Sequence, residues 1–225
     1  MSKLFGKKFL IISFVIFIVI VSFFIYSYVK KEKQEQRTQI LLGRITEAVN
    51  LTESAKTEMP QELLEVHEFL VKQIQTKEFK LYQIPPELKG KLIMYHGVKT
   101  KGIYVDPSID LRAEIWIPIF YHEAGHLYWH SQYPVETFEE FQEQLYASEG
   151  HSYIVGAQAW NVIKEHFPAI KENLNSQELK LFTLYEKETK LYNKMIEGDL
   201  TAKTDWNKII EENIRVQREQ QEFLQ

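Results

Sequence analysis

The chain has 225 residues, no cysteine and a formal net charge of −4 at pH 7. Without cysteine, disulfides and thiolate metal sites are excluded, so any metal must be held by histidine and carboxylate groups. Residues 1–37 contain seven Lys or Arg and two Asp or Glu, a net of +5, so the remainder carries −9, which disfavours nucleic-acid binding by the main domain.

The first predicted element is a run of 21 residues without a charge, from residue 9 to residue 29. A helix of this length spans about 30 Å, the thickness of the hydrocarbon core of a bilayer. Lysines flank the run, and no small-residue cleavage site follows it. The sequence therefore predicts a basic tail over residues 1–8 and an uncleaved transmembrane anchor in the lipid bilayer over residues 9–29. We expect a single-pass membrane protein whose large domain is extracytoplasmic, because short basic tails most often stay inside.

Residues 30–76 are predicted to form two helices. The first has a narrow apolar stripe that includes Ile40 and Ile45, and the second begins at Pro60 and has a wider apolar face. These helices either form a stalk or pack on the following domain, and the sequence leaves both open. His67 lies on the second helix, where a single histidine is usually not a metal ligand.

A small β-sheet is predicted after these helices. Residues 92–96 and 102–105 are short β-prone runs, and residues 97–101 between them suit the turn of a hairpin. An exposed edge strand of this sheet can pair with an extended peptide through backbone hydrogen bonds. The sheet would lie directly before the most informative motif of the chain.

The pentapeptide His122-Glu123-Ala124-Gly125-His126 has the H-E-x-x-H pattern. Residues four apart lie about 6 Å apart along a helix axis, so His122 and His126 can bind one ion. Two imidazoles suit Zn²⁺, which lowers the pKa of a bound water toward about 7, and Glu123 lies where its carboxylate can take a proton from that water. The alternative is a helix with two satisfied core histidines and a surface glutamate.

Pro118 decides where the motif helix begins. A proline breaks or kinks the interior of a helix but is tolerated in its first turn. The helix is therefore predicted to run from about residue 118 to residue 129, or to begin near residue 110 and to be kinked at Pro118.

With His122, Glu123 and His126 on a helix that follows a small sheet, residues 90–160 resemble the zincin metallopeptidases. The resemblance implies a hydrolytic zinc site. In the metzincin branch the motif continues to a glycine and a third histidine, and this chain has Trp129 and Gln132 there, which excludes that branch. The gluzincin branch uses a glutamate on a following helix as the third ligand, so the resemblance implies such a glutamate in this chain.

The third zinc ligand is expected on a long helix predicted over residues 135–165. His130 is excluded, because Cα atoms eight residues apart lie about 12 Å apart along a helix, too far for one ion. Glu149 is favoured, because small residues follow it, as in the gluzincins, and because it shares a helical stripe with apolar residues. Glu143 and His151 stay open as alternatives. The carboxylates of the preceding acidic run are more simply a solvated face: Glu136, Glu139, Glu140 and Glu143.

Hydrolysis of a carbonyl compound also needs a hydrogen-bond donor near the oxyanion that develops in the transition state. The sequence leaves this donor open among Tyr146, His151 and Tyr153. Each of these residues also has a simpler role in packing or hydrogen bonding. Residues 176–198 and 204–224 are predicted to be amphipathic helices. These helices would cover the domain or bind a partner protein.

The sequence thus predicts a mostly α protein with a small β-sheet (α+β), in which a zincin-like metallohydrolase domain over residues 77–225 follows the anchor. The predicted activity is that of a membrane-anchored zinc metallopeptidase that cleaves a peptide or protein substrate. His122, His126 and Glu149 would hold Zn²⁺, and Glu123 would be the general base. The main alternative is a non-catalytic, membrane-tethered binding or scaffold protein that retains the fold, although an intact Glu123 argues against it. A third alternative is zinc-dependent hydrolysis of a non-peptide bond.

Overall fold

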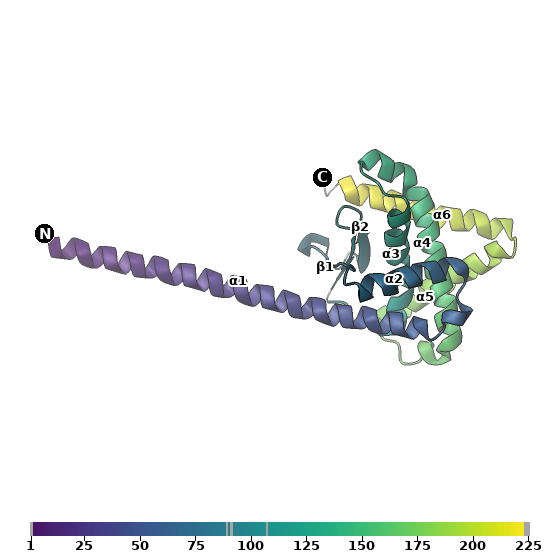
Figure 1. The fold of residues 1–225 in the computed structure, drawn as a ribbon, viewed down its shortest axis with the longest axis horizontal. Coiled ribbons are helices and arrows are strands. Elements are labelled where there is room, and N and C mark those ends of the chain that lie inside the picture. The colour runs from purple at the N-terminus through teal and green to yellow at the C-terminus, as the bar shows by residue number, and fades with distance from the viewer. Residues whose placement is uncertain (1, 89, 91, 107, 223–225) are drawn as a thin grey trace. The chain divides into compact units, whose positions relative to one another are not determined.

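The computed structural model describes the backbone of residues 2–88, 90, 92–106 and 108–222, and the side chains of these residues except 2–25, 34, 138 and 216–222. The described chain is mostly helical and contains one three-stranded sheet, as the sequence predicts (Figure 1). It divides into two compact units, residues 1–41 and residues 42–225. The motif and every candidate site residue belong to the second unit.

The predicted transmembrane anchor over residues 9–29 is corrected by the structure. In the part of the chain that the structure describes, no helix is long and apolar enough to cross a membrane. Residues 9–29 form part of a longer helix, α1 (Ser2–Glu53), and the side chains of residues 9–25 lie outside those described. From Tyr26 to Lys33 the helix is exposed and soon becomes charged. The predictions of a bilayer contact through residues 9–29, a single-pass membrane protein and an extracytoplasmic domain are corrected with it.

The second unit begins with the last part of α1, followed by a short 3-10 helix (Lys56–Glu58) and α2 (Gln61–Gln75). Pro60 precedes α2 directly, as predicted, because a proline with its fixed φ suits the start of a helix. His67 is fully buried on α2 and hydrogen-bonds to the hydroxyl of Tyr121 and to Glu53. The sequence prediction that His67 is a packing residue agrees with these contacts.

The sheet has the strand order β1-β3-β2 (Leu81–Gln83, Gly102–Val105 and Met94–Gly97). The predicted hairpin forms β2 and β3, which are antiparallel, and β1 adds in parallel to β3. Met94, Ile103 and Val105 are buried, whereas the tyrosines at the alternate positions stack across the three strands, as strand periodicity requires. β2 is therefore an edge strand, and it contacts helix α3.

Helix α3 (Ala113–Gln132) carries the motif, with Pro118 inside it. The helix begins at Ala113, so the predicted start at about residue 118 is wrong, and the alternative start near residue 110 is the closer one. α4 (Phe138–His166) lies against α3 and begins with a capping box between Thr137 and Glu140. A Cβ atom at Gly125 would lie 3.0 Å from the Cα atom of Ser152, a tighter contact than most Cβ atoms make, so a glycine favours this close approach of the two helices.

The C-terminal part contains a 3-10 helix (Pro168–Lys171), α5 (Ser176–Ile196) and α6 (Leu200–Glu222). Both long helices pack on α4, as Figure 1 shows, so the prediction that they cover the domain agrees with the structure. Apolar side chains from α4, α5 and α6 form one core cluster: Phe141, Leu145, Ala157, Tyr192, Trp206, Ile210 and Ile214. This cluster holds α4 in place beside the motif helix.

Candidate metal centre

His122 and His126 lie one turn apart on α3. The centroids of their rings are 5.0 Å apart, and the ring planes are nearly perpendicular. His126 is buried and His122 is partly exposed. Both imidazoles therefore face the same region beside α4, and one side of this region is accessible to solvent.

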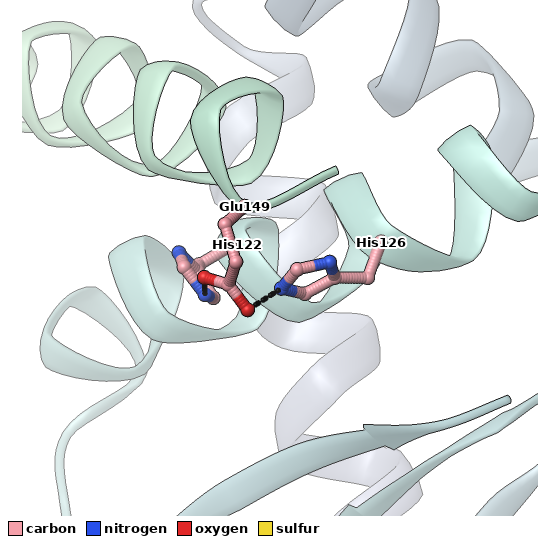
Figure 2. A group of neighbouring side chains, drawn as sticks. All are labelled: His122, His126 and Glu149. Carbon is pink, nitrogen blue, oxygen red and sulfur yellow. Dashed lines mark ion pairs between the residues drawn. The ribbon is translucent and has the colours of Figure 1, made fainter. Parts of the chain in front are cut away.

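Glu149 extends from α4 toward the two imidazoles (Figure 2). Its carboxylate is fully buried, with Oε1 3.2 Å from Nε2 of His126 and Oε2 3.7 Å from Nε2 of His122. One ligand atom from each of the three residues can be chosen so that all lie within 4.8 Å of one another. The structure thus brings together the three side chains that the sequence predicts as metal ligands.

Neighbouring side chains orient this group. The Oγ of Ser148 lies 2.7 Å from Nδ1 of His126, so Nε2 of that ring is directed toward Glu149. The side-chain amide of Asn213, on α6, donates a hydrogen bond of 3.1 Å to Oε2 of Glu149. Outer partners of this kind fix the orientation of metal ligands in known metal sites. Sequence reasoning missed both residues, because neither has a spacing pattern relative to the motif.

Glu123 is buried next to the same group and contacts the edge of the sheet. The backbone N–H of His96, in β2, donates a hydrogen bond of 2.7 Å to Oε2 of Glu123. The predicted general base is therefore tied to the edge strand. This bond also occupies an edge N–H that an added peptide strand would otherwise use.

Burial shifts the pKa values of the motif residues. It lowers the pKa of His122 to about 4 and raises the pKa of Glu123 to about 7. Burial also opposes protonation of His126, but the charge and hydrogen bond of Glu149 outweigh it, so the pKa of His126 is raised. The side chains of His122, Glu123, His126 and Glu149 therefore interact as one electrostatic group.

The alternative ligands lie elsewhere. Glu143 is exposed, and His151 packs against Tyr128 and Trp129. His130 lies at the far side of Ser148, 3.5 Å from its Oγ, and stacks on His96. None of these three belongs to the group that Glu149 forms with the motif histidines.

The three candidates for the oxyanion donor differ in how close they lie to the group that Glu149 forms with the motif histidines. Tyr146 is 46% exposed, and His151 contacts the far end of α3. The ring of Tyr153 contacts the ring of His122 edge-on, with centroids 4.7 Å apart. Tyr153 is therefore the candidate that contacts a motif histidine.

The donor set fits a zinc ion in its chemistry. Two imidazole nitrogens and one carboxylate oxygen are the ligands of many catalytic zinc sites, which leave a further position for water. A fully buried carboxylate is costly unless a cation or hydrogen bonds compensate its charge, and an ion between the three groups would do so. Zinc itself stays a prediction.

Comparison of the chain with protein-family models, with curated proteins and with solved structures finds no match. The resemblance to the zincins therefore rests on the residues of this chain alone.

Proposed function

We propose that this protein is a zinc-dependent metallopeptidase. The observation that carries the proposal is the convergence of His122, His126 and Glu149 on one point, with Glu123 next to His122 on the same helix. A bound zinc ion would supply a Lewis acid, which activates water and polarises a carbonyl group.

The residues of the chain divide the remaining work. Glu123 accepts hydrogen-bond donation from β2 through Oε2, which leaves Oε1 as the atom that takes a proton from the attacking water. The new bond joins the water oxygen to the carbonyl carbon, the C–N bond breaks, and Glu123 returns the proton to the leaving amine. Ser148 and Asn213 hold His126 and Glu149 in orientation during these steps.

One observation favours a second candidate function. Because His96 N–H bonds to Glu123, this glutamate also serves as a tie between β2 and α3. A non-catalytic binding protein with the same fold would need Glu123 for that tie alone. The two candidates therefore differ in whether the charge of Glu123 matters or only its hydrogen bond.

The substitution Glu123→Gln separates the two candidates. A glutamine still accepts the hydrogen bond from His96 but cannot take a proton, so zinc content and melting temperature stay near wild type while peptide hydrolysis falls by at least about 100-fold. The assay follows the appearance of new amino termini in a mixture of peptides. Equal hydrolysis by wild type and Glu123→Gln, or none by either at full zinc occupancy, would contradict the peptidase proposal.

A further inference from the structure

Gly156, in α4, lies directly against the turn of α3 that carries His122. A Cβ atom at this position would lie 3.1 Å from the carbonyl oxygen of Pro118 and 3.4 Å from the Cβ atom of His122. Both neighbours are fixed, because the oxygen belongs to the backbone of a helix and a Cβ atom moves only with its own backbone. A methyl group here would therefore have to push the two helices apart.

A second glycine of the same helix shows the contrast. A Cβ atom at Gly150 would meet the Cδ1 atom of Ile210 at 3.8 Å, which is an ordinary contact distance. Glycine in the interior of a helix is less favourable than alanine. Of these two glycines, Gly156 is the one whose missing side chain permits a close approach of a neighbouring helix.

Contacts between α3 and α4 follow one another in a row. Pairs of residues face each other along the two helices in this order: Gly156 and His122, Ser152 and Gly125, Ser148 and His126. Residue numbers rise along α3 while they fall along α4, so the two helices are antiparallel. Glu149 belongs to the same stretch of α4, so the separation of the helices along this row sets the distance from its carboxylate to the two imidazoles.

The three proposed metal ligands are held in different ways. Hydrogen bonds with neighbouring side chains orient His126 and Glu149. Apart from its 3.7 Å approach to Glu149, the ring of His122 makes no hydrogen bond or ion pair within the described part of the chain. The place of His122 is therefore set by packing, against the ring of Tyr153 and against Gly156.

The distances between the ligand atoms leave little room for displacement. Zinc bonds of about 2.0–2.1 Å at tetrahedral angles place two ligand atoms roughly 3.3 Å apart. Oε1 of Glu149 lies 3.2 Å from Nε2 of His126, and Oε2 lies 3.7 Å from Nε2 of His122. Ligand distances in a metal site hold within about 0.2 Å, so a small shift of α4 relative to α3 is enough to weaken the site.

We infer that Gly156 is a positioning residue of the candidate metal centre. Its lack of a side chain lets α4 lie close to the turn of α3 that ends at His122. This contact holds the imidazole of His122 beside Glu149 and His126, where one ion can reach all three (Figure 2). Gly156 does not touch the ion and acts through His122. The inference rests on the zinc centre of the proposed function and adds the residue that prepares this centre for the ion.

The substitution Gly156→Ala tests the inference, with Gly150→Ala as its control. Both add one methyl group to α4 and both raise its helix propensity, so the difference between them is what the methyl group meets. We expect zinc affinity to fall at least about tenfold in Gly156→Ala and to stay within about twofold of wild type in Gly150→Ala. Competition with a chelator measures both, on metal-free protein whose fold is checked by circular dichroism. Equal affinities in all three proteins, or an equal loss in both variants, would overturn the inference.

An effect on His122 is separated from a general loosening of the helix pair by repeating the change in a His122→Ala background. When Gly156 acts through this imidazole, its substitution has nothing left to displace there. Gly156→Ala should then change the remaining zinc affinity by less than about twofold, which a weaker chelator measures. The same loss in both backgrounds would contradict the positioning role.

A measurement on the unsubstituted chain decides the matter even where Gly156→Ala does not fold. In glycine a proton takes the place of the Cβ atom, so one α-proton of Gly156 is directed toward the Cβ atom of His122. Nuclear Overhauser contacts between these two groups should be present both without zinc and with it, because the position is fixed before the ion binds. Their absence from the metal-free protein would overturn the inference.

The outcomes also separate this inference from the proposed function. A wild-type chain that binds no zinc would overturn both. Zinc binding that Gly156→Ala leaves unchanged would overturn the positioning role alone and leave the zinc centre standing.

Discussion

Two buried histidines of this protein have nearly the same surroundings. Nδ1 of His67 lies 2.6 Å from the hydroxyl of Tyr121, and Nδ1 of His126 lies 2.7 Å from the hydroxyl of Ser148. On the other side of each ring, Nε2 faces a glutamate, Glu53 for His67 and Glu149 for His126. The local motif of hydroxyl, imidazole and carboxylate therefore does not by itself mark a metal site.

The difference lies in the glutamates. The side chain of Glu53 is 48% exposed and also pairs with a lysine, Lys56, whereas Glu149 is fully buried and shares its carboxylate between two imidazoles. A glutamate in solvent with its own cation is already compensated, and the histidine beside it acts as a tie between helices. Two imidazoles and one buried carboxylate that converge are instead the arrangement that a metal site requires, so the proposed ligands are His122, His126 and Glu149.

The largest expected effect is on zinc affinity, which should depend on Glu149 and not on Glu53. The binding free energy of a zinc site, about 10–16 kcal/mol, is shared among few ligands, so Glu149→Ala should weaken zinc binding by about a thousandfold or more. Glu53→Ala, the matched change at the other site, should leave zinc affinity within about twofold of wild type. Competition with a zinc chelator measures both. A similar loss in the two variants would remove the distinction between the sites.

His67→Ala tests the surroundings of His67 through the free energy of unfolding. The change opens a cavity in a fully buried place and leaves the hydroxyl of Tyr121 without its partner, so we expect a loss of roughly 2–4 kcal/mol in the free energy of unfolding. Zinc affinity of the folded variant should stay at the wild-type value. Urea unfolding without zinc measures the first quantity, and zinc loss in the folded variant would show that the two regions are coupled.

A smaller effect concerns pH. The hydrogen bond from His67, and to a lesser extent the positive charges nearby, hold the pKa of Glu53 below the ordinary value of 4.5. A lowered pKa in the folded state stabilises the protein above the unfolded-state value and loses this contribution as pH falls through the folded value. The stability difference between wild type and Glu53→Gln should therefore shrink below about pH 4.5. Unfolding curves between pH 6 and pH 3, taken without zinc, measure it, and a difference that grows on acidification would contradict the assignment.

The motif helix and its third partner could be predicted from sequence because helical spacing carries the information. His122 and His126 share a face by their four-residue separation, and Glu149 follows the apolar stripe of α4 into the interior. The hairpin could be predicted too, whereas β1, with three residues, is too short to give a strand pattern. Pro118 had two consistent interpretations, and only the packed structure chose between them.

Other features depend on contacts between distant segments and left no trace in the local pattern. Asn213 reaches Glu149 from 64 residues away, because α6 packs on α4, and the backbone N–H of His96 reaches Glu123 from the edge of the sheet. The prediction of an anchor over residues 9–29 is wrong, since none of the helices that the structure describes has the length and apolar character to cross a membrane.

The central claim is that His122 and His126, with Glu149, hold one zinc ion. The most direct measurement is the zinc content of the purified full chain, compared with that of the His122→Ala/His126→Ala double variant, by elemental analysis after dialysis. We predict about one zinc per wild-type chain and almost none in the double variant, because a single remaining ligand cannot retain the ion. Full zinc content in the double variant, or a wild-type chain that takes up no zinc, would contradict the account.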